Sequence, residues 1–264
     1  MGLTLHYTLK AQGSEAQARK LITALHQAAA DLPFKELGHL IDLAGEDCNF
    51  ERRRQDDPLR WLLVQAQESV IIKDASRSSR GGICERHCRV TPNRLLGFTA
   101  WPGEGCEEAN FGLCRYPATF TAPDGRTQKT MLAGWHWSSF CKTQYASNPE
   151  CGGAANFLRC HLTVIAMLDR AKALGCLSDV SDEGGFWAKR DLPALAKEIG
   201  SWNEMIAAFG GKLKDVLGEG VQSAISEYPN VEQLEAAGQD QLHPETETLA
   251  LLIKQVIAAR AVGV

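Results

Sequence analysis

The chain has 264 residues, of which 44% are hydrophobic and 23% charged, with a formal net charge of -4. This composition excludes a disordered chain, which would contain fewer apolar residues and more net charge. The negative net charge disfavours a nucleic-acid partner, because a phosphate polymer repels an acidic surface.

The N-terminal segment has neither the basic start nor the apolar core of about 7–15 residues that marks a secretory signal. No apolar run approaches the roughly 18 residues needed to cross a bilayer. We therefore expect a cytoplasmic protein with no membrane association. In that compartment the nine cysteines are expected to be reduced thiols or metal ligands rather than disulfides.

The first third of the chain predicts a β-α-β unit. Residues 3–9 alternate apolar and polar side chains, which is typical of a half-buried strand. Ser14 begins a Ser-Glu-Ala-Gln capping box, and apolar residues follow at helical spacing until Pro33. Residues 37–43 predict a second strand. A short helix beginning at Pro58 and a third strand at residues 69–73 come next.

The remainder predicts strands followed by helices. Residues 75–89, rich in Ser, Gly and Arg, indicate an exposed loop. Antiparallel strands are expected at residues 95–101, 111–116, 118–122 and 128–145, with a Pro-Asp-Gly hairpin turn at residues 123–125. Helices are expected at residues 153–174, 191–216, 230–237 and 245–261.

This order of elements predicts an α+β fold. We expect a mixed, largely antiparallel sheet with the N-terminal β-α-β unit, and a helical C-terminal half packed on it. Residues 1–148 would form the sheet-rich part and residues 149–264 the helical part, packed together as one compact unit.

Four cysteines lie closest together in the sequence, in a C-x3-C and a C-x7-C pair: Cys84, Cys88, Cys106 and Cys114. Zinc takes four soft ligands in a tetrahedron, and paired cysteines on tight turns supply them. The usual C-x2-C spacing is absent, so the alternative is that they are buried hydrophobes and loop thiols. Zinc is thus a possible cofactor, and we expect no other.

Cys141 is the candidate nucleophile that has a histidine nearby. A nucleophilic thiol needs a base within hydrogen-bond reach, and His136 is the nearest in sequence. Strand alternation would direct the two side chains to opposite faces. We therefore expect Cys141 to be a core residue.

The strongest candidate binding residues lie in two segments. Lys142, Thr143 and Gln144 end a predicted strand, where a cation and an amide suit a carboxylate, phosphate or amide ligand. Asp182 and Glu183 follow one helix later, either as acid and base or as a structural ion pair with Lys142. Trp187 would form a wall of either arrangement.

The segments FCKTQYA and DEGGFW, at residues 140–146 and 182–187, resemble a family of uncharacterised bacterial proteins. That family carries a KTQ-Tyr/Phe-Ala segment followed by an Asp-Glu-Gly-x-aromatic-Trp segment. LHYTLK at residues 5–10 and GCE at residues 105–107 look similar to it as well. The resemblance implies no activity. It does imply that the six candidate binding residues belong to one unit, and it does not include the loop that bears Cys84 and Cys88.

These observations predict a binding protein. We expect it to bind a partner protein or a small anionic ligand at a cleft between Lys142–Gln144 and Asp182–Trp187. The first alternative is a hydrolase or transferase with Asp182 or Glu183 as general base and Lys142 stabilising negative charge. The second is a zinc-dependent interaction module. No set of nucleophile, base and orienting group emerges from the sequence, which disfavours the enzyme.

Overall fold

The structure is a computed structural model that describes residues 3–74, 84–217 and 231–238. The chain folds into two compact units, and each unit is built from segments that alternate along the sequence with segments of the other. Unit 1 comprises Met1–Thr4, Thr143–Arg159 and Asp182–Val264, and unit 2 comprises Leu5–Lys142 and Cys160–Ser181. A division between residues 148 and 149 stays a prediction.

A six-stranded sheet forms the main layer, with antiparallel pairing between residues 41–44 and 94–97, between 94–98 and 111–115, and at His136 and Cys114. The predicted α+β fold is confirmed. The register sets Leu96 between Asp42 and Leu113, which fixes the face that each strand presents. In spatial order the strands are β12 (Leu177–Asp182), β1 (Thr4–Ala11), β11 (Trp135–Lys142), β8 (Phe111–Arg115), β6 (Arg94–Phe98) and β3 (Ile41–Ala44).

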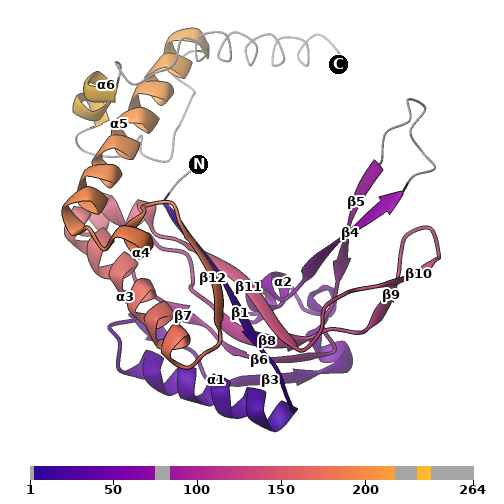
Figure 1. The fold of residues 1–264 in the computed structure, drawn as a ribbon. Coiled ribbons are helices and arrows are strands. Elements are labelled where there is room, and N and C mark those ends of the chain that lie inside the picture. The colour runs from indigo at the N-terminus through magenta and orange to yellow at the C-terminus, as the bar shows by residue number, and fades with distance from the viewer. Residues whose placement is uncertain (1–2, 75–83, 218–230, 239–264) are drawn as a thin grey trace, which may run out of the picture. The chain divides into compact units, whose positions relative to one another are not determined.

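Helix α1 (Glu15–Ala30) lies along one face of this sheet (Figure 1). Its capping box is present as predicted: the Ser14 side chain accepts from the Gln17 N–H, and the Gln17 side chain accepts from the Ser14 N–H. Ala18, Ile22 and Leu25 are buried on the inner side at helical spacing. Burial of this apolar stripe attaches the helix to the sheet.

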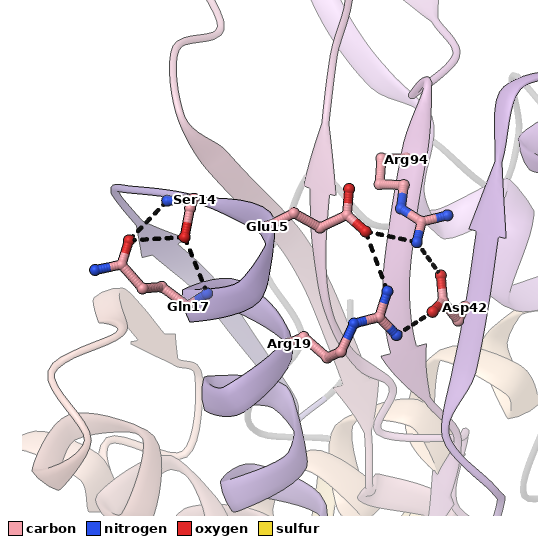
Figure 2. Close-up of polar contacts among 6 residues, drawn as sticks. All are labelled: Ser14, Glu15, Gln17, Arg19, Asp42 and Arg94. Atoms are coloured by element: carbon pink, nitrogen blue, oxygen red, sulfur yellow. Dashed lines mark hydrogen bonds and ion pairs between the residues drawn. The ribbon is translucent and has the colours of Figure 1, made fainter.

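A ring of charges surrounds the start of α1 (Figure 2). The Arg94 guanidinium on β6 donates to Glu15 at 2.7 Å and lies 2.6 Å from Asp42 on β3. Arg19 pairs with the same two carboxylates. Each carboxylate therefore contacts two cations, and the ring joins three elements that are distant in sequence.

The core beneath α1 is aromatic. Phe111 stacks on Tyr7 and on Phe98, with ring centroids 5.1 and 5.6 Å apart. The Tyr7 hydroxyl and the Trp137 indole N–H both donate to the carbonyl oxygen of Asn110, at 2.6 and 3.0 Å. The polar ends of two large buried side chains are thus satisfied at a single backbone group.

The predicted second strand is divided between two sheets. β2 (Glu36–Leu37) pairs with β7 (Ala100–Trp101), whereas β3 pairs with β6. Three strands separate β1 from β3 in the main sheet, so the β-α-β prediction is only partly consistent with the structure. Two 3-10 turns, Gly45–Cys48 and Phe50–Arg52, then lead to α2 (Arg60–Gln65).

Two ribbons extend from unit 2 (Figure 1). β4 (Glu68–Asp74) pairs along its whole length with β5 (Cys84–Val90), so the prediction of a loop is wrong for residues 84–89. The rest of that predicted loop, residues 75–83, lies outside the described residues. β9 (Thr119–Thr121) and β10 (Thr127–Lys129) form the predicted hairpin, and β10 is separate from β11.

The later elements are mainly helical. The 3-10 turns Gln144–Ser147 and Pro149–Cys151 precede α3 (Gly153–Ala173), and α4 (Phe186–Lys189) precedes α5 (Leu192–Leu217). Val231 and Leu234 of α6 (Val231–Gly238) pack on Ala207 of α5. Strand β12 was not predicted, and the helix expected at residues 245–261 lies outside the described part. Across the described ranges, no helix is long and apolar enough to span a membrane.

Candidate ligand site

The six candidate binding residues are divided between the units. Lys142 ends β11 in unit 2, where its backbone N–H donates to the Glu107 carboxylate at 3.2 Å. Thr143, Gln144, Asp182, Glu183 and Trp187 all belong to unit 1. The cleft predicted between the two segments therefore stays a prediction, and unit 1 is described by its own contacts.

Within unit 1, two of these residues hold the start of β1. The Glu183 carboxylate accepts from the Thr4 N–H at 3.0 Å, and the Glu183 N–H donates to the Thr4 carbonyl at 3.2 Å. The buried Thr143 donates its backbone N–H to the Leu3 carbonyl at 3.1 Å. These contacts support a structural role for Glu183 and Thr143.

Asp182 organises the turn that leads into α4. Its carboxylate accepts from the Gly184 N–H at 2.9 Å and from the Trp187 N–H at 2.7 Å. The guanidinium of Arg190 lies 4.6 Å from the centroid of the Trp187 ring, a cation-π distance. A carboxylate that caps exposed backbone donors is a common structural device, so these bonds favour structure over general-base chemistry for Asp182.

Gln144 is buried completely, and neither atom of its side-chain amide has a hydrogen-bond partner among the described residues. Next to it, Ser147 donates its hydroxyl to the Gln144 carbonyl at 2.7 Å and accepts from the Asn203 amide at 3.0 Å. Burial without a partner costs an amide free energy, so Gln144 is an unusual residue in this core. Its enclosure gives a ligand no access to the amide in this conformation.

The three predicted zinc ligands whose side chains are described, Cys88, Cys106 and Cys114, belong to no group of metal-ligating residues within the described ranges. Cys88 is buried on β5, Cys106 is partly exposed, and Cys114 is buried on β8, where burial raises the pKa of its thiol. Residues 84 and 88 are four apart on one strand, which separates their backbones by about 13 Å. The side chain of Cys84 lies outside the described residues, and zinc stays a prediction.

Cys141 is a core residue, as predicted. It is fully buried, its thiol donates to the Glu107 carbonyl at 3.2 Å, and burial raises the pKa of that thiol. The ring of His136 instead lies 3.3 Å from the Glu68 carboxylate. A thiol with a raised pKa is a poor nucleophile, because the thiolate is the reactive form.

The sequence did not indicate a pocket of about 500 Å³ in unit 2, which lies within the usual range for small-molecule sites. Thr130 lines this pocket and is fixed by two hydrogen bonds. Its hydroxyl donates to the Pro117 carbonyl at 2.7 Å, and its N–H donates to the Ala118 carbonyl at 3.0 Å. The pocket is lined by nine of the described residues, including the apolar Ala118, Leu132 and Ala133 and the polar or charged Arg115, Lys129 and Thr130.

Backbone conformation shapes the rim of this pocket. Gly134 has a φ of +76°, and a Cβ there would lie 2.9 Å from the Ala11 carbonyl, so a side chain would not fit. Met131 has a φ of +59°, a region that residues other than glycine rarely adopt, and it is 84% exposed. Met131 and Gly134 thus give the lining segment 131–134 two residues with left-handed backbone conformation.

The charge of the pocket is positive. Arg115 ends β8 and Lys129 ends β10, and no carboxylate lines the pocket. Among the described residues, neither side chain is paired with an acid. Two cations that share a concave surface without a counter-charge form an electrostatic site for an anion.

No protein-family model, curated protein or solved structure matches the chain.

Proposed function

We propose that this protein binds a small anionic ligand in the pocket formed by Arg115 and Lys129. The observation that carries the proposal is a pocket of about 500 Å³ whose lining contains two cations and no acid, and these cations have no acidic partner within the described part of the chain. A small anionic ligand is one of the two kinds of partner expected from the sequence, the other being a protein. The location of the site differs, because the contacts of Asp182, Glu183 and Thr143 support structural roles.

The two cations suit an anion with several oxygens. A guanidinium offers a planar fork of donors that matches carboxylate or phosphate geometry, and an ammonium adds a second, flexible donor. The side chain of Tyr116 does not compete for the anion, because its hydroxyl donates to the Ala66 carbonyl at 2.9 Å. A carboxylate or phosphate compound is therefore the ligand class that we propose.

A small ligand fits better than a partner protein at this position. Protein interfaces commonly present contiguous apolar surface, whereas Met131 is the one large, strongly exposed hydrophobic residue of this pocket. The other exposed large hydrophobic residues in the described ranges belong to other elements: Leu40, Trp61, Ile71, Leu174 and Leu192. Single exposed apolar side chains of this kind are normal on a protein surface.

Calorimetric titration of the full chain with inorganic phosphate and with citrate tests the proposal. Arg115→Gln and Lys129→Met should each weaken binding by about 10-fold or more, the effect of losing a charge-assisted hydrogen bond. Arg126→Gln is the matched control, because this exposed cation belongs to the same ribbon but does not line the pocket. Raising the salt concentration should also weaken binding, since both cations are accessible to solvent.

The proposal is wrong if neither anion binds, or if both pocket variants bind as tightly as the wild type. It is equally wrong if Arg126→Gln weakens binding as much as Arg115→Gln does. That result would assign the affinity to the overall charge of the ribbon.

A further inference from the structure

A second pocket, of about 230 Å³, lies over β12, β1 and β11, the three strands at one side of the main sheet. β1 contributes His6 and Thr8, β11 contributes Ser138 and Phe140, and β12 contributes Asp179. It shares no residue with the Arg115 pocket. The side chains of these five residues are exposed or partly exposed, so a ligand can reach them.

Strand pairing brings the four β1 and β11 side chains together. Residues two apart on a strand project from the same face, which places His6 with Thr8 and Ser138 with Phe140. The hydroxyl oxygens of Thr8 and Ser138 are 3.4 Å apart, and the ring centroids of His6 and Phe140 are 5.8 Å apart. The pairing of β1 with β11 therefore fixes a hydroxyl pair beside a ring pair.

The polar groups of the pocket are available to a ligand. Among the described residues, no hydrogen bond engages the Asp179 carboxylate or the His6 ring. The carboxylate only accepts, a neutral imidazole both donates and accepts, and the hydroxyls of Thr8 and Ser138 do both. A matching ligand must therefore carry donors and acceptors close together.

We propose that this pocket binds a neutral polyhydroxylated ligand, a single sugar ring. Hydroxyl groups of a sugar donate to Asp179 and exchange hydrogen bonds with Thr8 and Ser138. The exposed part of the Phe140 ring offers an apolar surface to the C–H groups of the sugar. The pocket volume of about 230 Å³ lies below the usual range of about 300–1,000 Å³ for small-molecule sites, which limits the ligand to one small ring.

The other ligand classes fit less well. Asp179 repels an anion, and no lysine or arginine lines the pocket to offset that charge. An ammonium ion offers donors alone, which leaves the donor capacity of His6 and of the two hydroxyls unused. A neutral ligand with many hydroxyls satisfies both kinds of group.

The presence of Ser138, His6 and Asp179 in one pocket does not make a catalytic triad. A triad needs a hydrogen bond from serine to histidine and another from histidine to the carboxylate. Ser138 contacts the Thr8 hydroxyl instead, and the His6 ring lies against Phe140. The geometry therefore points to binding rather than to nucleophilic catalysis.

NMR titration of the isotope-labelled full chain tests the inference, with the methyl glycosides of glucose, galactose, mannose and N-acetylglucosamine as probes. At least one sugar should cause saturable shifts at the backbone amides of Thr8, Ser138 and Asp179. Asp179→Asn should weaken its binding by about 10-fold, since hydrogen bonds to a charged acceptor are lost. Phe140→Leu, which keeps apolar bulk without a ring, should weaken binding as well.

Ser178→Ala is the matched control, because Ser178 precedes Asp179 on β12 but does not line the pocket. It should bind the sugar as the wild type does. The inference is overturned if none of the four sugars produces saturable shifts at these amides, or if Asp179→Asn binds with unchanged affinity. Saturable binding of tetramethylammonium without any sugar binding would also overturn it, because the pocket would then select a cation.

Discussion

Gly112 on β8 is where an added methyl group should reveal how tightly the core of unit 2 is packed. A Cβ at this position would lie 2.7 Å from Cε3 and 3.0 Å from Cδ2 of the Trp137 indole. Non-bonded carbons normally pack at about 3.5–4.0 Å, so the ring or the strand must move by about 0.8 Å to accept alanine.

The indole has little freedom to make that movement. Trp137 is fully buried, and its Nε1–H donates to the Asn110 carbonyl at 3.0 Å. Overpacking of a tight core costs about 1–3 kcal/mol, so Gly112→Ala should lower the free energy of unfolding by that amount. This loss of stability is opposite to the usual effect, because glycine-to-alanine changes in regular structure usually stabilise a protein by reducing backbone entropy in the unfolded state.

Urea unfolding followed by tryptophan fluorescence and by far-ultraviolet circular dichroism measures the effect. Gly200→Ala is the control: Gly200 lies in α5, and among the described residues no atom beyond its chain neighbours and its own helix backbone lies within 4 Å of the position of its Cβ. It should stabilise the protein by up to about 1 kcal/mol. In the double variant Gly112→Ala/Trp137→Phe, the smaller ring should accept the methyl group, with a coupling energy of at least about 0.5 kcal/mol. Wild-type stability of Gly112→Ala, or strict additivity in the double variant, would refute the packing argument.

Three further predictions concern caps and charges. Ser14→Ala removes the N-cap of α1 and should cost about 1 kcal/mol in urea unfolding; no loss would contradict the cap assignment. Hydrogen bonding from Arg94 lowers the pKa of Glu15, so stability should be complete above about pH 4.3 and decline on acidification through the folded-state pKa. Arg94→Met should reduce this loss of stability on acidification. An unchanged dependence of stability on acidic pH would contradict the contact between Arg94 and Glu15. Burial raises the pKa of the Cys48 and Cys176 thiols to about 11, above the roughly 8.5 of an unfolded thiol. Stability should therefore be complete below about pH 8.5 and fall toward pH 11, and a double alanine variant with the same slope would exclude these thiols as the cause.

Elements with strong local signals could be predicted from the sequence, whereas elements that depend on distant partners could not. The capping box at Ser14 and the apolar spacing of α1 are local, and both are confirmed. β5 has the sequence CERHCRV, which looks like a charged loop and becomes a strand because seven residues pair with β4. β12, with the sequence LSDVSD, is similar: mostly exposed polar residues adopt strand structure through pairing in the main sheet.

The candidate site shows the same limit. The sequence singled out Asp182 and Trp187 because charged and aromatic residues cluster there, and the structure explains that cluster by the capping of α4. Arg115 and Lys129 are ordinary single cations in the sequence. They define a pocket only because β8 and β10 end near each other, and no local pattern encodes that arrangement.

Charge separates the two proposed pockets of unit 2. An anion attracted by Arg115 and Lys129 is repelled by the exposed carboxylate of Asp179, while a neutral sugar gains nothing from two exposed cations that bind water well. Salt screens the attraction between opposite charges at the first pocket far more than it affects the second, because a neutral sugar carries no net charge. Salt concentration is therefore the variable that distinguishes the sites. Raising the salt concentration should weaken anion binding at the first pocket and leave sugar binding at the second nearly unchanged.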